Sequence, residues 1–233
     1  MEPVYQALVD RIQAKWSQQQ AHQEQSRPRL LIALAGPPGS GKTTIAEQVA
    51  LRLRQRAPSL RVACVSADGF HLPLATLRAL PNATEALARR GAPWTFDGAA
   101  TAAMVARLRA GAGRQAVVVP SFDHATKDPV AEGLVVGPDV QVCIVEGNYL
   151  LCDEAPWSRI AEIVDDRWLV VVDATLARDR VAARHVEAGI ERTMEEALAR
   201  AERNDMVNGE FVMRHSEGRA DLVIHSVEEA GQY

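Results

Sequence analysis

Residues 30–44 read LLIALAGPPGSGKTT, an apolar run of six residues that breaks into a glycine-rich turn ending in Lys-Thr-Thr. The apolar run predicts a buried β-strand, and residues 44–56 after it have a helical pattern. The turn has the spacing G-x-x-x-x-G-K-[ST], whose glycines let successive backbone N–H groups point inward at phosphate oxygens. This strand, turn and helix together predict a cradle for nucleotide phosphates, with the helix N-terminus adding a favourable dipole.

Each residue type in the turn has an expected role. Lys42 is expected to reach the β- and γ-phosphates, and the Thr43 hydroxyl is expected to bind Mg²⁺. A plain glycine turn is the alternative, which the flanking strand and helix make the weaker one. The residues expected to bind the nucleotide are Gly36, Gly39, Ser40, Gly41, Lys42, Thr43 and Thr44.

The 233-residue chain is long enough to bury one substantial core. We therefore expect one domain at residues 30–233, preceded by an amphipathic helix and a short linker at residues 1–29. A helix packed on its own domain is favoured there over a membrane or partner-binding helix, because its polar face is not strongly basic. The apolar residues that recur every four positions are Val4, Leu8, Ile12 and Trp16.

Charge and composition narrow the class of protein. A net charge of −4 argues against a general nucleic-acid binder, and no apolar stretch approaches the roughly 20 residues that span a bilayer. The three cysteines are odd in number and lack metal-ligand spacing, which favours reduced thiols in a cytoplasmic protein. The sequence leaves open whether the protein is a monomer or a homodimer.

Apolar runs that alternate with helical segments predict an α/β fold, a three-layer sandwich around a mostly parallel sheet of about five strands. Two acidic residues follow such runs directly: Asp68 after residues 60–66, and Glu146 after residues 140–145. Ligands bind outside the carboxyl ends of such strands, so both are expected beside the phosphate cradle. Asp68 is expected to accept a proton from a substrate hydroxyl or to hold a metal-bound water, and Glu146 to organise Mg²⁺. The further expected strands are residues 116–119, 168–172 and 220–226.

Two segments are candidates for contacts with a substrate. Residues 74–90 look helical but are interrupted at Pro81, which predicts a flap of two helical pieces. Asp97 after this flap either caps the next helix or binds a substrate. Residues 121–129 are rich in Asp, His, Thr and Lys, which suits either a polar substrate pocket or a solvated hairpin loop.

A helix after Asp173 carries Arg180 and Arg184, whose spacing of four places both guanidinium groups on one face. Phosphoryl transfer needs positive charge on the transferring group, whereas a basic face paired with nearby acids in solvent is the alternative. Residues 191–206 predict one more helix that starts after Thr193, with Gly209 as its C-cap.

Taken in order, these motifs resemble the uridine kinase and phosphoribulokinase superfamily of P-loop kinases. The resemblance is greatest to the branch described as nucleoside/nucleotide kinase-like or fructose kinase-like. It extends over residues 30–226, and its matching stretches are residues 36–44, 68–71, 90–97, 120–124, 145–149 and 180–185.

The resemblance implies an ATP-dependent kinase that transfers the γ-phosphoryl group to a hydroxyl of a small polar metabolite, such as a nucleoside, sugar or vitamin-like alcohol. It implies that Asp68 is the base, that Thr43, Glu146 and Asp68 organise Mg²⁺, and that Lys42, Arg180 and Arg184 stabilise the transferring group. A P-loop ATPase or nucleotide switch acting on a protein partner is the alternative, although no Asn-Lys-x-Asp guanine-reading motif occurs. The residues implied for the acceptor site are His71, Arg90, Phe96, Asp97, Phe122, Asp123, His124 and Lys127.

Overall fold

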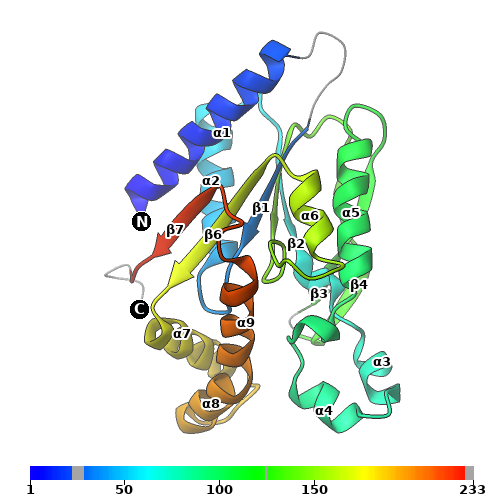
Figure 1. Cartoon of the computed structure of the whole chain (residues 1–233), viewed down its shortest axis with the longest axis vertical. Helices are drawn as coiled ribbons and strands as arrows, with labels where there is room; N and C mark the ends of the chain where they lie inside the picture. The colour runs from blue at the N-terminus through cyan, green and yellow to red at the C-terminus, as the bar shows by residue number, and fades with distance from the viewer. Residues whose placement is uncertain (23–28, 124, 229–233) are drawn as a thin grey trace.

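The computed structural model of the protein describes residues 1–22, 29–123 and 125–228. Its centre is a five-stranded sheet in the order β2-β5-β1-β6-β7, in which every pairing is parallel (Figure 1). The predicted parallel α/β fold is therefore confirmed. The strands of this sheet are β1 Leu30–Ala35, β2 Val62–Ser66, β5 Val142–Glu146, β6 Asp166–Val172 and β7 Leu222–Ser226.

Helices cover both faces of the sheet, and β1 shows why. All six of its residues are fully buried, because alternate side chains enter two different cores. One core lies under α1 (Glu2–His22) and α2 (Lys42–Arg56), and it contains Leu30, Ile32 and Leu34. The other lies under α5 (Gly98–Ala110), α6 (Ser158–Ile163) and α9 (Val207–Ser216), and it contains Leu31, Ala33 and Ala35. The result is the three-layer sandwich that the apolar runs predict.

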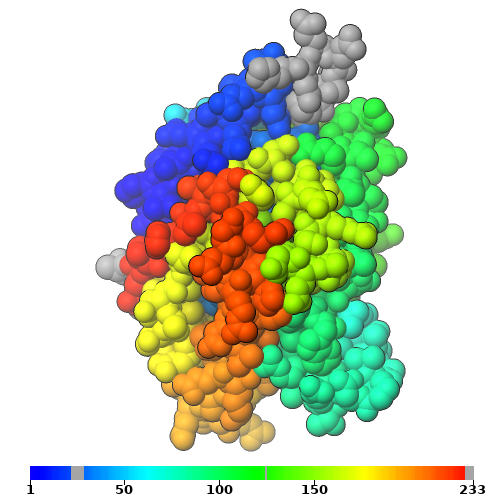
Figure 2. Space-filling view, in the orientation of Figure 1, coloured from blue at the N-terminus to red at the C-terminus, as the bar shows by residue number. Residues whose placement is uncertain are grey.

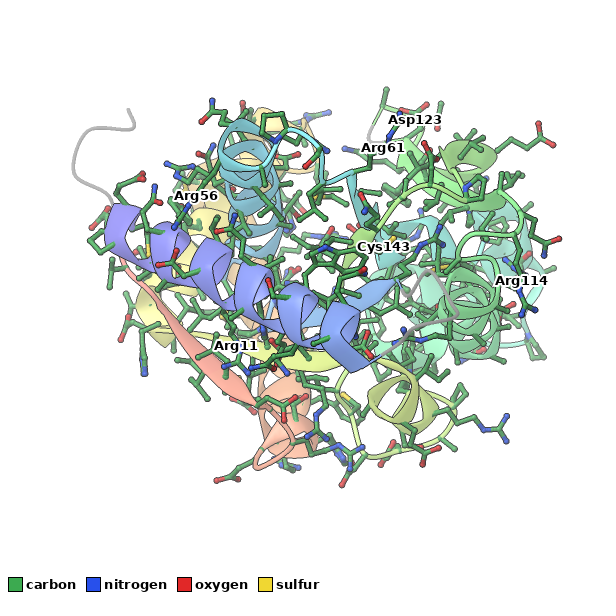
Figure 3. All side chains as sticks on the ribbon, turned by 90° about the horizontal axis from the view of Figure 1, so that it is seen from above. Arg11, Arg56, Arg61, Arg114, Asp123 and Cys143 are labelled. Carbon is green, nitrogen blue, oxygen red and sulfur yellow. The ribbon has the colours of Figure 1, made fainter. Side chains whose placement is uncertain are left out.

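The N-terminal helix α1 packs on this domain, with Tyr5, Leu8, Val9 and Ile12 buried in the first core. It is anchored by Asp166, a fully buried carboxylate at the start of β6. Arg11 donates two hydrogen bonds of 2.7 Å to Asp166, and the Trp168 indole donates another of 2.8 Å. Figure 3 shows Arg11 and Arg56 on opposite sides of α1. Residues 23–28 of the predicted linker lie outside the described residues.

The predicted flap is confirmed as two short helices, α3 (Leu74–Ala79) and α4 (Ala83–Ala88), on either side of Pro81. Figure 1 shows them projecting from the body of the molecule. Two 3-10 turns flank the flap: Ala67–Phe70 (η1) directly after β2, and Pro93–Thr95 (η2) before α5. The flap therefore starts and ends close to the carboxyl end of β2.

A β-hairpin stands apart from the main sheet and differs from the prediction. Strand β3 (Val117–Asp123) continues through Pro120, and it pairs antiparallel with β4 (Asp128–Val136), which the sequence analysis missed. Proline is tolerated there because the register shifts between Val119 and Ser121, as at a bulge. Strand β4 has mostly exposed or half-exposed residues, so its sequence lacks the apolar run of a buried strand.

The helices between β6 and β7 form one group, called the lid below, and include the predicted helix after Asp173. They are α7 (Ala174–Glu187), α8 (Met194–Arg200), a π-helical segment Ala201–Met206 (η3) and α9. The start after Thr193 is confirmed by a capping box with Glu196. The prediction that Gly209 is a C-cap was wrong, because α9 runs through it to Ser216. A Cβ at Gly209 would lie 3.2 Å from Pro37, so glycine lets α9 approach the glycine-rich loop closely.

The structure also bears on the cysteines and on membrane-spanning helices. Cys64, Cys143 and Cys152 are free cysteines, of which Cys143 and Cys152 are buried and Cys64 is half-buried. Among the helices of the described ranges, none combines the length and the apolar character needed to cross a membrane.

We predict that Asp166→Ala lowers the free energy of unfolding by about 1 to 3 kcal/mol, because it leaves the buried Trp168 indole N–H without its acceptor and Arg11 without its partner. The matched control is Asp10→Ala, which removes an exposed ion pair with Arg56 and should cost about 0 to 1 kcal/mol. Urea denaturation of both variants measures the difference. Equal denaturation midpoints for the two variants would show that Asp166 does not anchor α1.

Candidate functional site

The glycine-rich loop between β1 and α2 folds around a lysine. Gly39 and Gly41 adopt left-handed backbone conformations, with φ of 76° and 84°. A Cβ at Gly39 would lie 2.4 Å from the carbonyl oxygen of Ala177 in α7, so only glycine fits there. Lys42 is 8% exposed, and its ammonium group donates to the Pro37 carbonyl at 3.0 Å. The loop is thus closed around the ammonium group expected to meet phosphate oxygens.

Two carboxylates reach this lysine from the ends of neighbouring strands. Glu146 is the last residue of β5, in register with Leu34 of β1 and Ser66 of β2. Asp68 lies in η1 directly after β2, where its backbone N–H donates to the Ser66 hydroxyl. The structure therefore brings the predicted acids beside the loop, because parallel strands end at one edge of the sheet.

The electrostatics follow from burial. Burial lowers the pKa of Lys42 to about 8, against the opposing effect of Glu146 and Asp68. Burial also raises the pKa of Glu146, and the nearby charge of Asp68 raises it further, whereas Lys42 lowers it. The hydroxyl groups of Ser66 and Thr43 hydrogen-bond to Glu146. These side chains form one coupled cluster.

The cluster fits a magnesium ion bound together with phosphates. Asp68, Glu146 and Thr43 supply hard oxygen ligands, and two carboxylates facing one buried lysine leave room for a further positive charge. The described residues contain no group of three His, Cys, Asp or Glu side chains suited to a metal. Mg²⁺ is typically bound by one or two carboxylates, with phosphate and water oxygens completing its shell.

Ser40, Thr43 and Thr44 of the glycine-rich segment differ in burial. Ser40 is fully buried, and its hydroxyl has no hydrogen-bond partner among the residues that the structure describes. A buried hydroxyl of this kind fits a loop built to contact phosphate oxygens. Thr43 and Thr44 are exposed in the first turn of α2.

The two predicted arginines of α7 lie beside the loop. Arg180 donates to the Gly39 carbonyl at 3.3 Å, the Ser226 hydroxyl at 2.9 Å and the Val227 carbonyl at 3.0 Å. Arg184 is close enough for its charge to lower the pKa of Lys42. The ion pair with Asp179 is made by Arg178 instead, at 2.9 Å. Arg180 thus attaches α7 to the glycine-rich loop, and Arg184 adds positive charge next to Lys42.

Four of the residues implied for an acceptor form a cluster next to Asp68. The His71 ring hydrogen-bonds through Nδ1 to the Asp68 carbonyl at 2.8 Å. Its ring centre lies 3.9 Å from that of Phe96 and 4.9 Å from that of Phe122, and both ring pairs are tilted. The Arg90 guanidinium lies 5.6 Å from the centre of the Phe122 ring. This cluster, in which Arg90 is also paired with Asp128 at 3.3 Å, adjoins the residue expected to act as base.

The other implied acceptor residues have separate roles. Asp97 caps α5 by accepting from the Ala100 N–H at 2.8 Å, so of the two readings left open the structure displays capping. Asp123 accepts from Ala125 and Thr126 and so closes the hairpin turn. His124 lies outside the described residues. Lys127 is in the same turn, and its charge acts on His185 of α7, which places the hairpin tip near the lid.

Sequence reasoning missed the residues that connect the flap to the C-terminal helices. Asn204 donates to the Arg90 carbonyl at 2.8 Å, and Arg89 donates to Asn208 at 3.0 Å. Tyr149 donates to the Gly91 carbonyl at 2.5 Å. Asn204 and Asn208 are both nearly fully buried. Two asparagines four residues apart on the inner face of a helix are the signal that could have found this connection.

Several known proteins are similar to this chain, although no protein-family model matches it. The "putative uridine kinase C227.14" of Schizosaccharomyces pombe is 41% identical over 187 residues, which cover 80% of this chain and 79% of that protein. The "ATP-dependent kinase-like protein notR'" of Aspergillus versicolor is 41% identical over 150 residues, covering 64% and 87% respectively.

A solved structure of a kinase-named protein is also similar to this chain. The crystal structure of a "putative fructose transport system kinase" from Silicibacter sp. TM1040 superposes with a TM-score of 0.80 at 31% identity. It covers 94% of this chain and 98% of that protein. With the glycine-rich loop, the two strand-end carboxylates and the lid arginines in place, the chain belongs to the uridine kinase and phosphoribulokinase superfamily of P-loop kinases.

Proposed function

We propose that the protein is an ATP- and Mg²⁺-dependent kinase that transfers the γ-phosphoryl group to a hydroxyl of a small polar metabolite. The observation that carries this proposal is the meeting of Lys42, Asp68 and Glu146 at the carboxyl edge of β1, β2 and β5. Phosphoryl transfer needs little covalent chemistry from the protein, so positioning and charge stabilisation account for most of the catalysis.

The donor half of the reaction is assigned to the glycine-rich loop. Its backbone N–H groups and Lys42 would hold the β- and γ-phosphates of ATP. Thr43 and Glu146, with Asp68, would hold Mg²⁺, which when bound neutralises charge on the phosphate oxygens. Arg184 adds positive charge next to Lys42, and Arg180 keeps α7 attached to the loop.

Asp68 is assigned the role of the base that accepts the proton of the attacking hydroxyl. Asp68 is half-buried, and the charge of its carboxylate acts on Lys42. Its backbone carbonyl bonds to the ring of His71, which lies against Phe96 and Phe122. A hydroxyl that binds over this cluster would donate its proton to a carboxylate oxygen of Asp68 as the oxygen attacks phosphorus.

The acceptor is proposed to be a nucleoside, a sugar or a vitamin-like alcohol. An aromatic cluster with one guanidinium group suits a small molecule that has both an apolar face and polar groups. The names of the relatives support this class, because they refer to a uridine kinase and to a kinase of a fructose transport system. A small molecule, rather than nucleic acid or membrane, is the proposed partner.

We predict that Asp68→Asn abolishes transfer of phosphate from ATP to a metabolite panel while leaving the nucleotide Kd within about threefold of wild type. The variant loses the base and one oxygen ligand of Mg²⁺, which should slow phosphoryl transfer more than it weakens the binding of ATP by the glycine-rich loop. Asp139→Asn, in an exposed ion pair with Arg61, is the matched control and should be fully active. Full turnover by Asp68→Asn would remove this residue from the mechanism, and ATP hydrolysis stimulated only by a protein would favour a nucleotide switch.

We predict that nucleotide affinity falls as pH rises above about 8. The pKa of Lys42 is lowered to about 8, so its ammonium is present below this pH and is lost above it. Since phosphates bind the ammonium form, the Kd should weaken about twofold from pH 7 to 8 and about tenfold from pH 7 to 9. Calorimetric titrations of ATP at fixed Mg²⁺ measure this, and Lys42→Met should be weaker and flat over the same range. An equal pH dependence in Lys42→Met would assign the effect to another group.

A further inference from the structure

The π-helical segment η3 is the point where the lid and flap meet. It interrupts the helix between α8 and α9, and such segments are rare and recur at functional sites. Asn204 of η3 donates to the Arg90 carbonyl of the flap turn, and Gly209, just beyond, packs on Pro37 of the glycine-rich loop. In Figure 2 the lobes formed by α8 and by α3 and α4 lie on either side of a notch at the lower edge of the molecule. Asp205 therefore lies in a segment that contacts both the flap and the glycine-rich loop.

Asp205 and His185 face each other at this junction without a hydrogen bond. Asp205 Oδ2 lies 3.7 Å from Nε2 of His185 in α7, and the two side chains are only 15% and 8% exposed. Asp205 Oδ2 and His185 Nδ1 are buried, and neither has a hydrogen-bond partner among the residues that the structure describes. A buried carboxylate oxygen that lacks a hydrogen-bond donor destabilises the folded protein. The pair differs in this respect from the neighbouring Asn204 and Asn208, whose side chains are hydrogen-bonded.

The charges around the pair fix its chemistry. Burial raises the pKa of Asp205, whereas Arg184, Arg200 and Arg89 oppose this shift. Burial also lowers the pKa of His185 to about 4, with the charges of Arg200, Arg184 and Lys127 acting in the same direction. The imidazole is therefore neutral at pH 7, with one N–H donor and one acceptor nitrogen. One hydroxyl between Asp205 Oδ2 and the facing Nε2 of His185 would donate to the carboxylate and accept from an Nε2–H.

We propose that Asp205 and His185 bind a second hydroxyl group of the acceptor, one that does not receive the phosphoryl group. This inference rests on the proposed function, and it narrows the substrate class to molecules with at least two hydroxyls, such as sugars, nucleosides and other polyols. The neighbours of the pair support an acceptor subsite. Arg184 acts on both Lys42 and Asp205, Lys127 of the hairpin tip acts on His185, and η3 is bonded to the flap.

The test compares wild type with Asp205→Asn, using a panel of pentoses, hexoses and nucleosides with their singly deoxygenated analogues. For a phosphorylated compound, Asp205→Asn should raise the acceptor KM about 10- to 100-fold and leave the ATP KM unchanged, because a hydrogen bond to a charged group is lost. One deoxy analogue should lose a similar factor with wild type and lose little more with the variant. Glu202→Gln, an exposed position of η3, is the matched control and should behave as wild type.

His185→Gln is the second variant, in case Asp205→Asn folds poorly, and it should show the same selective rise in acceptor KM. Unchanged acceptor KM values in a folded variant, with only the melting temperature lowered, would make the pair purely structural and leave the kinase function intact. Transfer only to compounds with a single hydroxyl would also overturn the subsite.

A binding readout separates failure of the subsite from failure of the proposed function. Each panel compound is added with ADP and Mg²⁺, and the shift in melting temperature is recorded for wild type and Asp205→Asn. If wild type transfers no phosphate but a polyol stabilises it and not the variant, the subsite stands and the kinase function fails. If nothing is transferred and no polyol stabilises the wild type, both are overturned.

Discussion

A buried ammonium group next to two carboxylates is the interaction on which the site depends. Lys42 and Glu146 are nearly inaccessible to solvent, and charges in such places are tolerated only when they compensate one another. The compensation is set by the sheet: Glu146 ends β5 between Ser66 of β2 and Leu34 of β1, and the loop after β1 curls back so that Pro37 accepts from Lys42. A shift of either strand by one residue would turn these groups to the wrong face. The two buried cores that fix β1 therefore also fix the charges.

In the proposed function, the donor and acceptor halves of the site are built differently. The donor half is held by buried parallel strands and by a loop in which glycine is required at Gly39. The acceptor half is assembled from extensions of the sheet, namely the flap, the hairpin and the lid, joined by side-chain hydrogen bonds such as those of Asn204 and Arg89. Changes in these extensions would alter the acceptor without disturbing the nucleotide cradle, as expected where one fold serves many substrates.

How far the sequence predicts this arrangement depends on the kind of signal. Buried strands such as 30–35 are continuous apolar runs, so the sheet, the position of the loop and the positions of Asp68 and Glu146 at the strand ends were predicted correctly. Strand β4 was missed because its residues are largely exposed and mixed in character. Gly209 was wrongly predicted to end a helix. Glycine is needed at this position because α9 packs closely on Pro37, and a tertiary contact of this kind leaves no local sequence pattern. Asn204 and Asp205 were unassigned for the same reason, since their role arises where three distant segments meet.

We propose that one cluster holds both the nucleotide phosphates and the base for the acceptor. The most direct measurement is a crystal structure of the protein with a non-hydrolysable ATP analogue and Mg²⁺. We expect the β- and γ-phosphates to contact Lys42 and the metal to lie between the Thr43 hydroxyl and the carboxylate of Glu146. Asp68 should face the γ-phosphate from the side of His71. A triphosphate bound away from Lys42, or an Asp68 carboxylate turned away from the γ-phosphate, would contradict it.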